Sequence, residues 1–209
     1  MRFIIVPGLD GSDHHHWQSA WESSWLPNAA RITPTSWTDP DRDDWTTAID
    51  HAVHHPAARS SGQRRNPADD DVILITHSLG CLAATHWLTT SPSPTVRGVF
   101  LVAPPDPLAP TFPIPLLDTF IPFEAAELHV PAVLIVSEDD PYCTVDAANR
   151  LAIAWDVPLI SAGRQGHLNS DSDLGLWPAG QDLLTSFLAG LGHPRATPPR
   201  SLAADRRTR

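Results

Sequence analysis

The sequence of 209 residues contains no lysine, so no lysine Schiff base can form on this chain. It has only two cysteines, Cys81 and Cys143. Two are too few for a disulfide scaffold or for a four-cysteine zinc site. We interpret them as free, buried thiols in a reducing compartment, and we therefore expect a cytoplasmic protein.

Long apolar runs are also absent. The longest are of the size of residues 72–75 and 131–136, whereas a transmembrane helix needs at least about 18 apolar residues. The first residues, 1–8, contain neither a long apolar segment nor a small-residue cleavage site, so a secretory signal is not expected. We accordingly expect no membrane partner.

The charge is strongly one-sided, with a formal net charge of −10. Five of the 14 arginines lie in the last 15 residues, so the rest of the chain carries nine arginines against 23 acidic residues. A body this acidic argues against binding to a phosphate backbone, and we expect no nucleic-acid partner. Binding of nucleic acid through the arginine-rich tail remains a weaker alternative.

Apolar segments alternate along the chain in a way that predicts six strands separated by helices. Strands are predicted at residues 2–6, 30–32, 72–75, 96–103, 132–137 and 157–160, and helices at 17–25, 43–55, 81–88, 147–155 and 183–191. Such alternation is typical of an α/β fold with a mostly parallel sheet and helices on both faces. In these folds ligands bind at the carboxyl ends of the strands.

The composition, with 42% hydrophobic and 18% charged residues, is that of a globular chain, and the length suits one domain, which we place at residues 1–191. The polar stretch 56–71 is interpreted as an exposed loop of that domain. The proline-rich stretch 104–131 is interpreted as an irregular segment that lines or covers a site. Residues 192–209 are expected to be a disordered, arginine-rich tail.

Ser78 follows the most apolar predicted strand and is separated from Gly80 by one residue. A serine on a sharp strand-to-helix turn exposes its hydroxyl above the sheet, where helix amides can hold an oxyanion. The usual pattern is G-x-S-x-G, but Thr76 stands at the first glycine position. Because threonine is larger, we expect a looser turn. The S-x-G pattern alone is weak evidence for a nucleophile.

A nucleophilic serine needs a base and an orienting acid. Asp140 and His167 each follow a predicted strand, and the chain order Ser, Asp, His is that of the α/β-hydrolases. Asp140 is preferred as the acid because a proline fixes the turn directly behind it. Asp139 and Asp106, which also follow strands, remain alternatives.

The glycine-containing bend after the first strand predicts the rest of an oxyanion hole. Gly8 lets the backbone approach a substrate oxygen, and the amides of Leu9 and Leu79 are the expected donors. A simple turn without this role is the alternative interpretation.

Three consecutive histidines, residues 14–16, suggest a metal site at first sight. Neighbouring side chains diverge on a helix or a strand, and no carboxylate cluster has a matching spacing, so we expect neither a metal nor a cofactor. Instead, His16 and Trp17 are expected to pack near the site and to contact the substrate, and His14 and His15 to be solvated.

Seven short motifs together resemble one known family, that of the small YdeN and retinoblastoma-binding-protein-nine-like serine hydrolases. The resemblance covers residues 1 to about 191. The motifs are Val6-Pro7-Gly8, His16-Trp17-Gln18 with Trp21-Glu22, His77-Ser78-Leu79-Gly80, Val102-Ala103-Pro104, Ser137 to Tyr142, Gly166-His167-Leu168-Asn169 and Gly175-Leu176-Trp177-Pro178.

This resemblance implies a three-layer α/β-hydrolase fold with little or no cap, an esterase-like activity, and Ser78, Asp140 and His167 as nucleophile, acid and base. We therefore expect hydrolysis of a small-molecule ester through an acyl-enzyme. Acyl transfer or amide cleavage by the same residues is the alternative within enzymes. A non-enzymatic protein-interaction module on a hydrolase fold is the alternative outside them. The sequence identifies no protein partner.

Overall fold

The computed structural model describes residues 1–26, 28–55, 70–113 and 115–191. Six strands form one sheet in the order β2-β1-β3-β4-β5-β6, and each pairing between neighbours is parallel. The expectations for the loop at 56–69 and for the tail at 192–209 fall outside the described residues.

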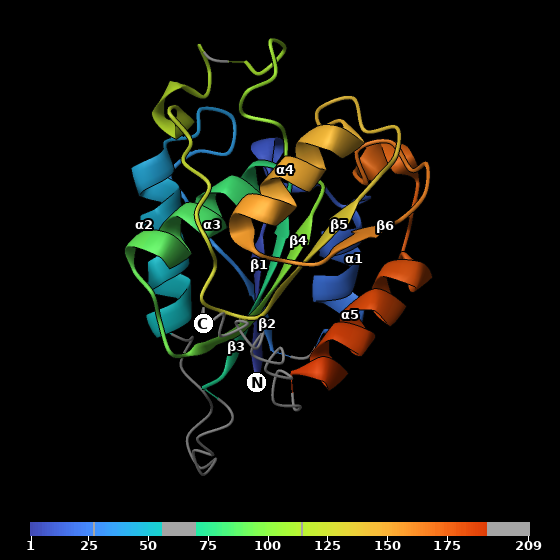
Figure 1. Cartoon of the computed structure of the whole chain (residues 1–209). Helices are drawn as coiled ribbons and strands as arrows, with labels where there is room; N and C mark the ends of the chain where they lie inside the picture. Colours follow the sequence, from blue (N-terminus) through green and yellow to red (C-terminus); the bar gives the residue numbers. More distant parts are fainter. Residues whose placement is uncertain (27, 56–69, 114, 192–209) are drawn as a thin grey trace, which may run out of the picture.

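The elements have the following bounds (Figure 1). The strands are β1 (Arg2–Val6), β2 (Ala29–Arg31), β3 (Val72–His77), β4 (Val96–Val102), β5 (Ala132–Val136) and β6 (Leu159–Ser161). The α-helices are α1 (Trp17–Ser24), α2 (Arg42–His54), α3 (Leu79–Thr90), α4 (Val145–Trp155) and α5 (Pro178–Gly190). The described residues also form the short 3₁₀ helices η1 (Leu9–Gly11), η3 (Asp118–Phe120) and η4 (Ser170–Ser172).

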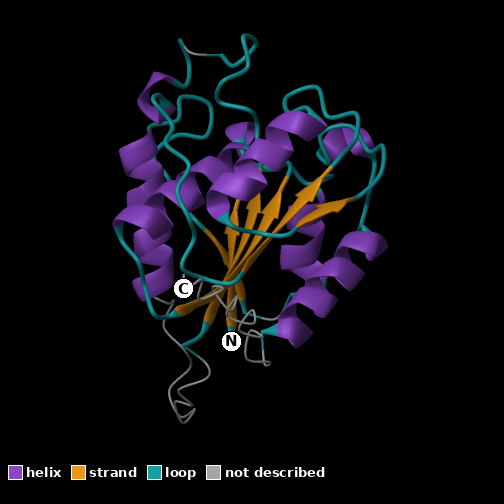
Figure 2. Ribbon diagram, viewed as in Figure 1, coloured by secondary structure: helices purple, strands orange, loops and turns teal. Residues whose placement is uncertain are grey.

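The sheet is buried between two layers of helices (Figure 2). Alternate residues of each strand point to opposite faces. In β3, Leu74 packs in the cluster formed with α2, α3 and α4, whereas Ile73 and Ile75 pack in the cluster formed with α1 and α5. The predicted α/β fold with a parallel sheet and helices on both faces is confirmed.

Several predicted element boundaries differ from the observed ones, and two of these differences have a clear physical reason. The last strand begins at Leu159 rather than at residue 157, because Asp156 adopts a left-handed conformation and the Val157 N–H bonds to a carbonyl of the preceding helix. The closing helix begins at Pro178, five residues earlier than predicted. Proline is favoured in the first turn of a helix, where its missing N–H has no partner to lose.

All strands end at the same side of the sheet (Figure 2), and the first part of the segment after β4 lies beyond these ends, before the chain returns to the start of β5 (Figure 1). This proline-rich segment is largely irregular and has the single-turn helix η3, but it is anchored by buried side chains, among them Phe112, Leu117 and Phe120. Within the described residues no separate cap domain stands over the strand ends, and no helix there has the length and apolar content needed to cross a bilayer.

Cys81 and Cys143 are both free and buried. Burial raises the pKa of each thiol to about 12. Neither therefore carries the thiolate character of a reactive cysteine.

Candidate active site

Ser78 is the only residue between β3 and α3. Its backbone has φ 53° and ψ −127°, a conformation that is strained for a residue with a side chain. The turn is tight because two glycines, Gly8 and Gly80, allow neighbouring segments to lie close together around it. A Cβ on Gly80 would collide with the carbonyl oxygens of Val6 and Pro7, and one on Gly8 would lie 2.6 Å from the Cβ of Ser78.

Thr76 does not loosen this turn. Its buried hydroxyl lies 3.0 Å from the Sγ of Cys81 and donates to the carbonyl of Phe100 at 3.3 Å. The threonine thus satisfies its polar atom inside the sheet, and β3 still runs directly into Ser78. The expected looser turn is not found.

The structure brings Ser78, His167 and Asp140 into one hydrogen-bonded chain. Ser78 Oγ lies 2.8 Å from His167 Nε2, and His167 Nδ1 lies 2.9 Å from Asp140 Oδ2. Because a carboxylate only accepts, Nδ1 carries the proton and Nε2 accepts from the serine hydroxyl. The side chains of His167 and Asp140 are only 8% and 2% exposed. Such a chain can remove a proton from a serine hydroxyl.

The two alternative acids do not contact the histidine. Asp139 accepts hydrogen bonds from the Ser137 hydroxyl and from the Gly166 N–H, both at 2.9 Å. These bonds lower the pKa of Asp139. Asp106 lies on the wall of the cavity and pairs with Arg150 at 3.2 Å. Asp139 therefore holds the turn in front of His167, and Asp106 belongs to another loop.

Two neighbours hold the histidine in place that sequence reasoning did not assign to it. The Nε2–H of His77 donates to the backbone carbonyl of His167 at 3.0 Å, and the ring of Tyr142 meets the His167 ring edge-on, with centroids 4.6 Å apart. Burial lowers the pKa of His77 well below its usual value, so it is a neutral donor. Strand alternation places His77 on the same face as Ile75, which is the signal that could have found this contact.

A cavity of about 340 Å³ opens above Ser78 and His167. One wall comes from the proline-rich segment and includes apolar side chains, namely Pro105, Ala109, Phe112, Pro113 and Leu117. A second part of the lining, called here the polar wall, is formed by Asp10, Ser12, Asp13, Asn169, Ser170 and Asp171.

Leu9 and Leu79 both line the cavity beside Ser78. Leu9 is the first residue of η1 and Leu79 the first of α3. The N–H groups of a first helical turn have no acceptor within their own helix. Both amides are thus available to an oxygen atom bound above Ser78.

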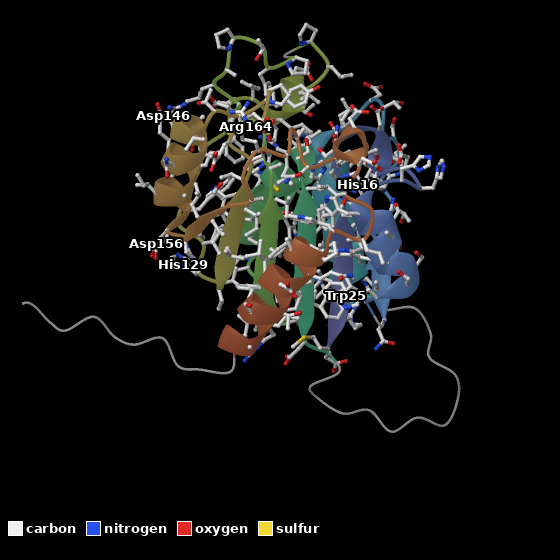
Figure 3. All side chains as sticks on the ribbon, turned by 90° about the vertical axis from the view of Figure 1, so that its right-hand side faces the viewer. His16, Trp25, His129, Asp146, Asp156 and Arg164 are labelled. Carbon is white, nitrogen blue, oxygen red and sulfur yellow. The ribbon has the colours of Figure 1, made fainter. Side chains whose placement is uncertain are left out.

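His16 is 3% exposed and lines the cavity. It lies near the loop that follows β6 (Figure 3). Its Nδ1 accepts from the Gln18 N–H at 3.1 Å and so caps α1. Burial lowers the pKa of His16 to about 3. His14 and His15 are exposed.

Trp17 and Gly8 are not among the residues that line the cavity, whereas Leu9, Leu79 and His16 are. The indole Nε1–H of Trp17 donates to the carbonyl of Leu168 at 2.8 Å, and its ring packs against Trp21 and Trp177. Trp17 therefore supports the loop of His167 from behind. Among the described residues no group of three or more His, Cys, Asp or Glu side chains is placed to hold a metal ion.

Comparisons with known proteins indicate a family and a fold. A family model described as serine hydrolase matches residues 3–186. A solved structure from Pectobacterium atrosepticum, described as a YdeN-like hydrolase, is 33% identical, with 91% of each chain covered and a TM-score of 0.74.

Two more distant structures share the fold. The ydeN gene product of B. subtilis is 22% identical over 90% of this chain and 98% of its own, with a TM-score of 0.67. Carboxylesterase CesB from Bacillus subtilis is 14% identical over 90% and 84%, with a TM-score of 0.57. None of the curated proteins compared with the chain matches it.

Proposed function

Because this chain belongs to the serine hydrolase family, we propose that it cleaves small carboxylic esters through an acyl-enzyme formed on Ser78. The observation that carries the proposal is the continuous hydrogen-bonded chain from Ser78 Oγ through His167 to the buried Asp140. A neutral serine hydroxyl is a weak nucleophile, and this arrangement supplies the base that it needs.

In the acylation half, Ser78 Oγ attacks the ester carbonyl carbon while His167 Nε2 takes the hydroxyl proton. Asp140 fixes the Nδ1–H tautomer and stabilises the imidazolium that forms. The tetrahedral intermediate then collapses. The bond to the leaving oxygen breaks, His167 returns the proton to that oxygen, and the alcohol departs.

The oxyanion of the tetrahedral intermediate is held by the amides of Leu9 and Leu79. Removing one such donor from an enzyme costs about 10²–10³-fold in rate, so the placement of these two amides is a large part of the proposed catalysis. Gly8 and Gly80 contribute indirectly, because they allow the two helix starts to lie close to Ser78.

In the second half, water attacks the acyl-enzyme. His167 removes a proton from the water, the carboxylic acid is released, and the proton returns to Ser78. A different acceptor in place of water would make the same site an acyltransferase, and an amide substrate would make it an amidase.

The first test is reaction of the purified protein with a fluorophosphonate probe, beside Ser78→Ala, read by intact mass. One adduct on the wild type that is absent from the variant supports an activated Ser78. No adduct on the folded protein would contradict the proposal and favour a non-enzymatic interaction module. The cytoplasmic location and the absence of nucleic-acid and membrane partners remain predictions.

A further inference from the structure

The two walls of the cavity above Ser78 differ in chemistry, and the residues of the polar wall come from two loops. It comes from residues 10–16, which follow β1, and from residues 169–171, which follow His167. The Ser170 hydroxyl joins these two loops by donating to Asp13 at 2.8 Å. The polar wall is therefore one surface, and it adjoins the proposed base.

His16 lines this cavity and carries a ring nitrogen that has no hydrogen-bond partner among the described residues. Its Nδ1 accepts from a backbone N–H, so in the neutral ring the proton sits on Nε2. Nε2 is buried and has no hydrogen-bond partner among the described residues. The low pKa of the ring keeps it neutral. A buried, unsatisfied N–H costs free energy unless a ligand or water meets it.

Asp10 and Asp171 supply acceptors on the same wall. Within the described part of the chain, no hydrogen bond or ion pair reaches either carboxylate, and no arginine lines the cavity. A hydroxyl group both accepts and donates, so it suits a donor such as His16 Nε2–H together with these acceptors. An ammonium group would meet the carboxylates but could not accept from His16. A carboxylate on the substrate would be repelled.

The position of the base decides which part of the substrate lies here. His167 has to return a proton to the leaving oxygen, so the alcohol must leave beside its ring. Residues 169–171 belong to the same loop as His167, and the ring of His77 lies between His16 and His167, with centroids 4.6 Å and 5.0 Å away. The leaving alcohol therefore faces the polar wall, and the acyl chain faces the apolar one.

We propose that the substrates are esters of a short apolar acid with a neutral, hydroxyl-bearing alcohol, which His16 Nε2–H binds as donor and Asp10 and Asp171 bind as acceptors. This inference rests on the proposed ester hydrolysis and names its substrate class.

The test compares two butyrate esters that differ only in the hydroxyls of the alcohol, glycerol 1-butyrate and propyl butyrate. Release of butyric acid is followed with the full chain, and p-nitrophenyl butyrate serves as an activated reference. We expect kcat/KM to be at least about tenfold higher for the glycerol ester. The propyl group offers no hydroxyls, so it leaves the polar groups of the site without hydrogen-bond partners.

Two variants separate the donor from the helix cap. In His16→Asn, the amide oxygen can still accept from the Gln18 N–H, but no donor remains at the position of Nε2. In His16→Gln, an amide N–H reaches that position, but the cap is lost. We expect His16→Asn to abolish the preference for the glycerol ester at nearly unchanged Tm. We expect His16→Gln to recover part of the preference at a lower Tm. The exposed His14→Asn is the matched control and should behave as the wild type.

The outcomes distinguish the two proposals. A wild type that cleaves none of the three esters refutes the proposed hydrolysis. A wild type that cleaves the reference ester but does not prefer glycerol 1-butyrate to propyl butyrate overturns the inference about the alcohol and leaves the proposed hydrolysis standing. If His16→Asn retained the preference for the glycerol ester, or if His16→Gln lost more of it than His16→Asn, His16 would act only as a helix cap and not in substrate binding. The comparison of the two butyrate esters with the wild type tests the inference even if both variants fail to fold.

Discussion

Gly80→Ala probes how closely α3 must approach the end of β1 for Ser78 to be presented. A methyl group on Gly80 would collide with the carbonyl oxygens of Val6 and Pro7 and would lie 3.0 Å from the carbonyl carbon of Pro7. All three are backbone atoms of a buried strand end, so they cannot rotate away as a side chain would. Either the start of α3 or the end of β1 has to move.

The expected magnitude follows from two opposing effects. Extra methyl groups in a packed core usually cost about 1–3 kcal/mol, and two backbone collisions favour the upper end of that range. Alanine in place of glycine in a helix returns about 1 kcal/mol. The net loss of about 2 kcal/mol corresponds to a fall in Tm of about 4–8 °C for a chain of this size.

The same displacement should affect catalysis more than stability. The strand end that would move leads into the loop of Leu9, and the helix start carries the amide of Leu79. A misplacement of about 1 Å in a catalytic arrangement can lower the rate about 10²-fold. We therefore expect kcat on p-nitrophenyl butyrate to fall by about this factor, while KM changes less.

Thermal unfolding and steady-state kinetics on the same preparations check both numbers. Gly190→Ala is the control, because an added Cβ at the last residue of α5 meets no heavy atom within 4 Å. This variant should be at least as stable and as active as the wild type. A Gly80→Ala protein with unchanged Tm and kcat would refute the argument that close backbone contact presents the serine.

Ser78→Ala should lower the rate of ester cleavage about 10³-fold or more, and Asp140→Asn about as much or less, in steady-state kinetics; near-normal turnover by the former would contradict an acyl-enzyme on that oxygen. Burial holds the pKa of His16 at about 3 and that of His77 well below 6.5 in the folded chain. The unfolded chain then binds more protons below about pH 6.5, so Tm should fall as the pH is lowered from there, and a Tm that rises on acidification would contradict this. Because burial raises the pKa of the Cys81 thiol to about 12, iodoacetamide should modify it only after unfolding, as intact mass with and without urea would reveal.

The order of the elements could be predicted because the sheet is parallel and buried on both faces. Its strands are short apolar runs that differ clearly from the amphipathic helices between them. Chemistry-bearing residues that directly follow such runs must gather at one end of the sheet. Ser78, Asp140 and His167 were predicted to meet on this ground alone, and the structure places them within hydrogen-bond distance.

What the sequence could not supply are hydrogen-bond partners that lie far away along the chain. From the side-chain volume of Thr76 we predicted a looser turn. This turn is not found, because the Thr76 hydroxyl donates to the carbonyl of Phe100, 24 residues away. Trp17 was expected to pack near the site and to contact the substrate. Its hydrogen bond to Leu168 decides for the core, and no local pattern encodes that contact.

The two indole hydrogen bonds from α1, to Leu168 and to Leu176, connect residues that are 151 and 155 positions apart. A chain emerging from the ribosome therefore completes the region around Ser78 long before the loop that carries His167 has been synthesised. Until then, the tryptophans of α1 have no carbonyl partners, and their face of β1 and β3 has no α5 to cover it. A nascent or truncated chain that ends before this loop would expose an apolar surface and would hold a serine without its base. The proposed activity is thus withheld until the loop that carries His167 has been made.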